Sequence, residues 1–156
     1  MIKYYHKTNI FSIHFIKLIM KYIIHRGITS NTIKENTYQS IKKALLDKNS
    51  LGVELDIRLT KDHKIVLSHN QIINNNYIEN MNYKDIIKHT YLPTLDKILD
   101  INTNKIILID IKVNNNYKEF ANTLIELLNK YNKNIYLASF KNKEANKFAL
   151  HHFTVM

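Results

Sequence analysis

The stretch Gly52-Val53-Glu54-Leu55-Asp56-Ile57-Arg58 alternates apolar and charged residues. Alternation with a period of two is typical of a β-strand, on which Glu54 and Asp56 project to the same face. Two neighbouring carboxylates repel each other, and a divalent cation between them relieves that repulsion. The same pattern also occurs on solvated strand faces, where the acids pair with a cation such as Arg58. The stretch therefore predicts a strand that carries either a metal site or a solvated charged face.

Strand-like and helix-like patterns alternate on both sides of this stretch. Short apolar runs predict further strands at 21–25, 64–69, 105–112 and 134–139. Amphipathic patterns predict helices at 35–47, 83–89, 94–101 and 117–131, separated by an Asn-rich loop at 74–82. The spacing of Thr32 and Glu35 predicts a capping box for the first of these helices. Strands that alternate with helices imply a largely parallel sheet, with about five strands against the eight that close a βα barrel.

Polar residues at the ends of these strands are candidates for chemistry. Asp110 and Lys112 are two residues apart, so they place a third carboxylate and an ammonium on one strand face. Oxygen ligands in a chain without cysteine favour Mg²⁺ or Ca²⁺ over zinc. His25 and His69 each end a predicted strand, and carboxyl ends of parallel strands are where active sites gather. A lone His there is more often structural, whereas two favour acid–base catalysis.

The composition limits the remaining classes. The chain has 156 residues, 45% of them hydrophobic and 23% charged, which is typical of one soluble globular domain. Its formal net charge is +10, but the lysines are spread along the chain together with many Asn and Ile residues. That mixture is typical of A- and T-rich codons, whereas a nucleic-acid site requires a clustered basic face. We therefore expect no nucleic-acid partner.

The N-terminal region is expected to be separate from the domain that follows. Ile10–Ile24 is apolar, but one His and two Lys interrupt it, so it is too short and too charged to cross a bilayer. It also lacks the small-residue cleavage site of a signal peptide. We expect a cytoplasmic protein without a transmembrane segment, in which residues 1–19 are an N-terminal extension or accessory helix and Met20 is an alternative start.

A series of short motifs follows the order and spacing of a known family signature. The motifs are His25-Arg26-Gly27, Glu35-Asn36-Thr37, Glu54–Asp62, Val66–Asn70, Leu92–Leu95, Asp110-Ile111-Lys112 and Ala138-Ser139-Phe140. Each is weak alone, but the ordered series from about Met20 to Phe140 resembles the glycerophosphodiester phosphodiesterase family. The resemblance implies a TIM-type (β/α) barrel that hydrolyses glycerophosphodiesters to glycerol 3-phosphate and an alcohol. Lysophospholipids are a second substrate class by the same resemblance.

The resemblance also implies a role for each motif residue. It makes His25 and His69 the general acid/base pair. It makes Glu54, Asp56 and Asp110 the ligands of one divalent cation, Mg²⁺ or Ca²⁺. It places Arg26 and Lys112 against the phosphoryl oxygens, and it gives Glu35, Asn36 and Asn70 supporting roles. In family accounts a glycerol hydroxyl attacks first, and water then opens the resulting cyclic phosphate.

Three departures from the family pattern affect these expectations. Asp110 stands where the family has Glu, so its carboxylate reaches roughly 1.5 Å less far and is expected to bind metal more weakly or through water. Asn70 stands where the family has Asp, which removes a charge beside His69 but keeps a hydrogen-bonding side chain. The chain ends before the last strands of the family barrel, so we expect residues 20–156 to form an incomplete barrel, truncated at its C-terminal end.

Two hypotheses of different classes follow. The first is an active metal-dependent phosphodiesterase, with self-association through the open barrel edges. The second is a truncated, inactive family member that only binds phosphodiester or metal. The presence of both histidines, the acids and Lys112 favours the first, and the missing part of the barrel favours the second.

Overall fold

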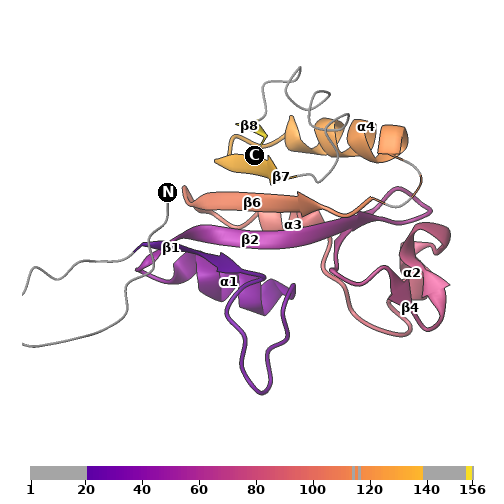
Figure 1. Cartoon of the computed structure of the whole chain (residues 1–156), viewed down its shortest axis with the longest axis horizontal. Coiled ribbons are helices and arrows are strands. Elements are labelled where there is room, and N and C mark those ends of the chain that lie inside the picture. The colour runs from indigo at the N-terminus through magenta and orange to yellow at the C-terminus, as the bar shows by residue number, and fades with distance from the viewer. Residues whose placement is uncertain (1–20, 114, 116, 139–153, 156) are drawn as a thin grey trace, which may run out of the picture.

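The protein is described by a computed structural model that covers residues 21–113, 115, 117–138 and 154–155. Its centre is a six-stranded sheet in the order β1-β2-β6-β7-β8, with β3 paired to β2. The strands are β1 (Tyr22–His25), β2 (Ser50–Leu59), β3 (Ile65–Leu67), β6 (Ile106–Ile111), β7 (Ile135–Ala138) and β8 (Thr154–Val155). Figure 1 shows this sheet as an open, twisted layer. The predicted α/β fold is confirmed, and no closed barrel forms within the described ranges.

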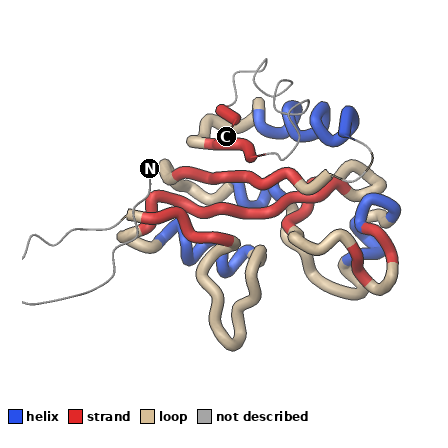
Figure 2. Tube along the Cα trace, in the orientation of Figure 1, coloured by secondary structure: helices blue, strands red, loops and turns tan. Residues whose placement is uncertain are grey.

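Short helices and a small hairpin complete the fold (Figure 2). The helices are α1 (Tyr38–Leu46), α2 (Tyr83–Ile86), α3 (Leu95–Leu99), α4 (Tyr117–Leu128) and the 3₁₀ helix η1 (Ile78–Asn80). The hairpin consists of β4 (Ile72–Ile73) and β5 (Asn76–Tyr77). The stretch 74–82 was predicted to be a loop, but it contains β5 and η1. Asn74 and Asn75 adopt positive φ angles of 46° and 60°, which suit the two-residue turn between β4 and β5.

The two faces of the sheet have different environments. Apolar residues of β2 pair in register with apolar residues of β6, as in Val53 with Ile107 and Leu55 with Ile109. These side chains belong to one buried core with apolar side chains of α1, α3 and α4, so the helices cover this face. The intervening residues, which include Glu54 and the registered pair Asp56 and Asp110, project to the opposite face. The alternation along β2 and β6 therefore places apolar side chains on the face packed against the helices and the three carboxylates on the opposite face.

The strand at Ile65–Leu67 corrects part of the predicted topology. It was expected among the parallel strands, but it pairs antiparallel with β2, with Leu67 opposite Ile57. The five-residue connection between Leu59 and Ile65 is too short for the crossover that a parallel strand needs. The other four predicted strands are parallel to one another, and β8, which was not predicted, adds a fifth parallel strand beside β7.

The start of α1 also differs from the prediction. The capping box is formed by Thr37 and Ser40, whose side chains each bind the other's main-chain N–H, and not by Thr32 and Glu35. The helix cannot begin earlier because Asn36 has a positive φ of 52°. The other predicted helices and strands are observed with their ends shifted by a few residues. The largest change is in α2 (Tyr83–Ile86), which ends before residue 89, where the predicted helix ended.

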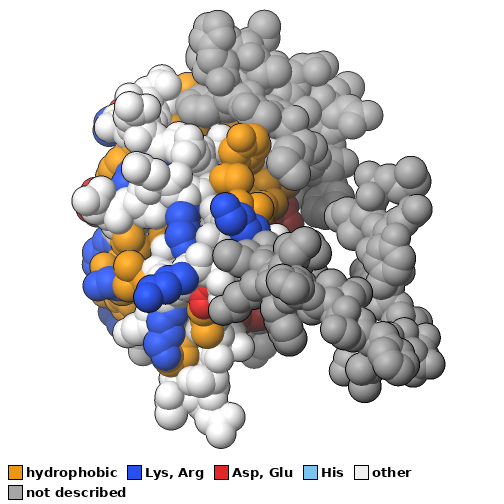
Figure 3. Space-filling view, turned by 90° about the vertical axis from the view of Figure 1, so that its left-hand side faces the viewer, with side chains coloured by type: hydrophobic (Ala, Val, Ile, Leu, Met, Phe, Trp, Pro, Cys, Tyr) orange, Lys and Arg blue, Asp and Glu red, His pale blue; other side chains and the backbone are white. Residues whose placement is uncertain are grey.

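Two predictions concern residues outside the described part. These are the accessory segment 1–19 and the motif positions Ser139 and Phe140. Within the described part, no helix is long and apolar enough to cross a membrane. Figure 3 shows the face at which β2 begins, where Lys and Arg side chains lie at separate places among apolar and other side chains.

Gly27 is required by the close approach of the loop after β1 to α1. It adopts a φ of +87°, and a Cβ atom at this position would lie 2.5 Å from the main-chain carbon of Ser40. Gly27→Ala is therefore expected to lower the free energy of unfolding by about 1–3 kcal/mol. Urea denaturation measures this change, with the exposed helix variant Gln39→Ala as a control that stays within about 0.5 kcal/mol. Equal stability of Gly27→Ala and the wild type would contradict the tight contact.

Candidate metal centre

Three carboxylates meet on the face of the sheet opposite the helices. Glu54 and Asp56 come from β2 and Asp110 comes from the neighbouring strand β6, where it stands directly opposite Asp56. One carboxylate oxygen from each lies within 4.8 Å of the other two. Oxygen–metal distances of about 2.3–2.6 Å for Ca²⁺ place two ligands of one ion at most about 5 Å apart, so this spacing fits a shared cation. The three acids that were predicted to lie together are thus brought together.

Asp56 lies at the middle of a network of charged and polar side chains. Its side chain is only 1% exposed, and Lys112 Nζ lies 3.2 Å from its Oδ1 atom. Arg26 Nε lies 3.0 Å from Oδ2, although this N–H is not aligned for a hydrogen bond. Asn36 holds Asp56 from both sides, because its Nδ2 donates to Oδ2 over 2.8 Å and its Oδ1 accepts from the Asp56 main-chain N–H over 3.1 Å. Asn36 therefore holds Asp56 in place.

Two buried carboxylate oxygens in this centre lack a well-aligned hydrogen-bond donor. They are Oδ1 of Asp56 and Oδ1 of Asp110: neither has a well-aligned hydrogen bond in the described residues, and Asp56 Oδ1 is paired only by charge, with Lys112 Nζ at 3.2 Å. Buried polar atoms are normally satisfied, because leaving one unpaired costs about 1–3 kcal/mol. A cation bound between the carboxylates would satisfy both atoms. The residues present therefore fit a hard divalent cation, and they include no thiolate or imidazole in the group of three.

The charges in the centre influence one another. Burial raises the pKa of Glu54, and the negative charge of Asp56 raises it further, against the opposing effect of the Arg26 main-chain N–H. Burial alone would lower the pKa of Lys112, but the hydrogen bond and charge of Asp110 and the proximity of Asp56 outweigh it and raise the pKa. Lys112 Nζ donates to Asp110 Oδ2 over 2.6 Å. The centre therefore combines crowded carboxylates with a firmly protonated ammonium.

The loop after β1 brings two further predicted residues to the acids. His25 stands opposite Glu54 in the parallel register, and its Nε2 lies 3.8 Å from Glu54 Oε2 with the side chain 70% exposed. Arg26 follows with a positive φ of 55°, and its main-chain N–H donates to the carbonyl and the carboxylate of Glu54. Its guanidinium donates to Glu35 Oε1 over 3.1 Å. Glu35 therefore orients Arg26, which gives it the supporting contact that was expected.

His69 reaches the same edge by a different route from the predicted one. It does not end a parallel strand, because β3 runs back along β2 and ends at Leu67. The main-chain N–H of Ser68 donates to the carbonyl of Asp56 over 3.1 Å, which fixes the chain beside the acids just before His69. Asn70 is exposed, and its carbonyl accepts from the Ser68 hydroxyl over 2.8 Å. Among the described residues no hydrogen bond joins the Asn70 side chain to His69. The role of Asn70 in orienting His69 stays a prediction.

Arg58 is a residue that the sequence indicated only as a charge partner for the acids. It follows Glu54 and Asp56 on the same face of β2 and is 9% exposed. Burial lowers the pKa of Arg58, while the charges of Asp56, Glu79 and Asp110 oppose that shift. The alternation of residues 54, 56 and 58 could have indicated a buried cation, but not which groups it contacts.

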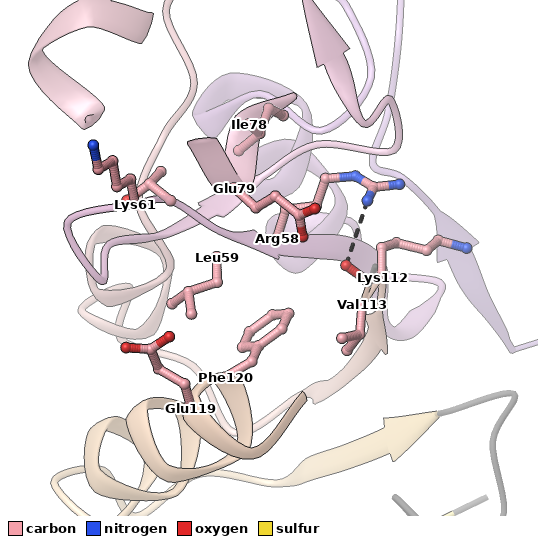
Figure 4. A pocket seen from close by; sticks show the side chains of 10 residues that line it. Arg58, Leu59, Lys61, Ile78, Glu79, Lys112, Val113, Glu119 and Phe120 are labelled. Atoms are coloured by element: carbon pink, nitrogen blue, oxygen red, sulfur yellow. Dashed lines mark hydrogen bonds between the residues drawn. The ribbon is translucent and has the colours of Figure 1, made fainter. Parts of the chain in front are cut away.

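Two cavities adjoin the centre. One of about 180 Å³ is lined by Arg58 and Lys112 together with Glu79 and Phe120, among others. Figure 4 shows Arg58 and Lys112 side by side at its edge and the Phe120 ring across from them. The other, of about 280 Å³, is lined by residues that include Glu35, Asn36, His69 and Asn70. The centre therefore has space on both sides for the groups of a small molecule.

The arrangement combines the groups that phosphoryl transfer requires. Carboxylates that can hold a cation, together with Lys112 and Arg26, can stabilise negative charge on phosphoryl oxygens. Imidazoles that are exposed beside them can exchange protons with a bound molecule. A solvated charged face, the alternative for the strand pattern, does not describe Asp56, which is 0% exposed.

Comparisons with known proteins agree with this interpretation. The glycerophosphoryl diester phosphodiesterase family matches residues 25–155. A crystal structure of a glycerophosphodiester phosphodiesterase from Thermotoga maritima is 30% identical, with a TM-score of 0.69, 81% coverage of this chain and 57% of that chain. No curated protein sequence matches the chain.

Two further solved structures share the fold. One is a putative glycerophosphodiester phosphodiesterase from Galdieria sulphuraria, with a TM-score of 0.72, 19% identity and coverage of 86% of this chain and 63% of that one. The other is an Oleispira antarctica phosphodiesterase in complex with the product sn-glycerol-3-phosphate, with a TM-score of 0.67, 17% identity and coverage of 83% and 61%. The chain thus spans less than two thirds of the length of each of these structures.

Proposed function

Because the chain belongs to the glycerophosphoryl diester phosphodiesterase family, we propose that it hydrolyses glycerophosphodiesters to glycerol 3-phosphate and an alcohol with the help of one divalent cation. The observation that carries this proposal is the meeting of Glu54, Asp56 and Asp110 within 4.8 Å, with a buried Asp110 oxygen that accepts no hydrogen bond from the described residues. His25, Arg26 and Lys112 lie beside these acids.

In the proposed mechanism the three acids hold the cation, which supplies Lewis-acid stabilisation of negative charge when it is bound. Asp110 contributes to this set despite its short side chain, because its strand is directly paired with β2 at Asp56. Either Mg²⁺ or Ca²⁺ suits an all-oxygen set. Asn36 keeps Asp56 in place through two hydrogen bonds, so the ligand geometry is established before a substrate arrives.

Lys112 and Arg26 are proposed to bind the phosphoryl oxygens. Both side chains are mostly buried, at 19% and 18% exposed, and both contact Asp56. Fixed cations in a site with little water stabilise the charge of a phosphoryl transition state more strongly than solvated ones. Arg26 is further oriented by Glu35, so its guanidinium is held before the substrate binds.

His25 and His69 are proposed to exchange the protons of the reaction. One imidazole takes a proton from the attacking hydroxyl of the glycerol, and the other gives a proton to the oxygen of the departing alcohol. The O–P bond to the alcohol breaks as the new O–P bond forms, which leaves a cyclic phosphodiester. Water then opens this ring with the two proton transfers reversed, which yields glycerol 3-phosphate.

Release of glycerol 3-phosphate from glycerophosphocholine tests the proposal. We expect release by the purified chain with Mg²⁺ or Ca²⁺, loss of release with EDTA, and recovery when the metal is restored. A parallel assay with a lysophospholipid distinguishes the two substrate classes. A folded, soluble sample that binds metal but releases no product from either substrate would support the binding-only alternative.

A further inference from the structure

The Arg58 guanidinium donates its hydrogen bonds to main-chain carbonyls on two different segments. Its Nη2 and Nε atoms donate to the carbonyl of His69 over 2.7 and 3.2 Å. Its Nη1 atom donates to the carbonyl of Lys112 over 3.4 Å. Figure 4 shows the contact with Lys112, which links the end of β2 to the chain just after β6. One buried side chain therefore contacts both the segment that carries His69 and the segment that carries Lys112.

These contacts lie where the chain leaves the sheet. His69 follows the end of β3, and Lys112 follows the end of β6, so neither carbonyl belongs to a strand ladder. Among the hydrogen bonds between described residues, those from Arg58 are the ones that hold the His69 carbonyl. The Ser68 N–H bond to Asp56 holds the chain just before His69, and the Arg58 side chain holds the His69 carbonyl itself.

The chemistry of the contact requires arginine. A guanidinium presents several N–H donors in one plane, and it can bind one carbonyl with two of them while a third reaches another segment. A lysine ammonium at the same position keeps the charge but is a single point with no fixed fork. Burying a cation is costly unless its hydrogen bonds are kept, so the bonds of Arg58 to the two carbonyls favour one arrangement of the two segments.

We propose that Arg58 is a positioning residue that sets the distance between His69 and Lys112 across the metal centre. This inference rests on the proposed function, in which His69 transfers a proton and Lys112 binds the phosphoryl group. Arg58 acts through the main chain of these two residues.

The test compares Arg58→Lys with the wild type in steady-state kinetics on glycerophosphocholine. We expect kcat to fall about 100-fold while KM changes little, because a misplacement of about 1 Å at a reacting group can cost this much. In Arg58→Ala, added guanidinium at concentrations far below denaturing ones should restore part of the lost kcat. Urea or KCl at the same concentration should not. Lys43→Met, which removes an exposed lysine on α1 that does not line the cavity beside Arg58, is the matched control and should keep the wild-type kcat.

A second measurement does not depend on turnover. In NMR spectra of the metal-free protein, Arg58→Lys should shift or broaden the ring signals of His69 and leave those of His25 nearly unchanged. If the wild type releases no product, the proposed function fails and these spectra alone judge Arg58. Unchanged His69 signals, or a kcat within about twofold of the wild type without guanidinium rescue, would overturn the proposal.

Discussion

His25→Ala is expected to reduce the turnover of glycerophosphocholine by about 10²–10⁴-fold, the usual contribution of a general acid or base. The His25 side chain is 70% exposed, and its one ion pair with a described residue is the 3.8 Å contact with Glu54, so its removal should not disturb the fold. A large loss of kcat in a protein with an unchanged melting temperature would therefore report chemistry and not stability. Stopped assays that follow glycerol 3-phosphate measure the effect.

The control for this experiment is His89→Ala, because His89 is also exposed but lies on the segment after α2, outside the centre. We expect it to match the wild type within about twofold. His69→Ala should resemble His25→Ala, since each imidazole is needed for one of the two proton transfers. Retention of more than about a tenth of the wild-type kcat in both His25→Ala and His69→Ala would contradict their proposed role.

Asp56→Asn is expected to lower the affinity for Mg²⁺ or Ca²⁺ by about 100-fold or more, since even groups behind the ligands typically contribute 10–100-fold. The Asp56 carboxylate is 1% exposed and lies between the other two acids, so neutralising it removes a central ligand charge. Isothermal titration of the metal-free protein measures the affinity directly. Turnover at saturating substrate should fall in parallel and recover partly at high metal concentration.

Two further variants make the Asp56 experiment decisive. Glu126→Gln removes an acid whose side chain is 80% exposed on α4, and its metal affinity should equal that of the wild type. Glu54→Gln removes a ligand whose side chain is 12% exposed, and it serves where Asp56→Asn does not fold, because Asp56 also pairs with Arg26 and Lys112. Metal affinities of Asp56→Asn and Glu54→Gln within about threefold of the wild type would refute a cation at this centre.

Much of the centre could be predicted from the sequence because it lies on strands. The period of two in residues 52–58 places Glu54 and Asp56 on one face whatever the neighbouring elements do. The run that contains Asp110 has the same property, so the meeting of the acids required only that the two strands be adjacent. The ordered motifs supplied that expectation, and the register of Asp56 with Asp110 fulfils it.

Other parts could not be predicted because they depend on contacts between distant segments. The Thr32 and Glu35 pattern was wrong as a helix start, since Asn36 is held by Asp56 in a backbone conformation that excludes the helix. The run at 64–69 has the composition of any strand, and only its pairing with β2 makes it antiparallel. Its direction determines how His69 returns to the acids.

The sequence by itself thus determined the α/β class, the strand faces and the identity of the charged residues, because periodicity and residue chemistry are local properties. Only the tertiary structure decided that Asp56 is fully buried between Arg26, Lys112 and Asn36, and that Arg58 joins the His69 and Lys112 segments. Burial and hydrogen-bond partners are set by which segments pack together. For that reason the shared strand face of Glu54 and Asp56 could be inferred from spacing, whereas the contacts of Arg58 with two distant segments could not.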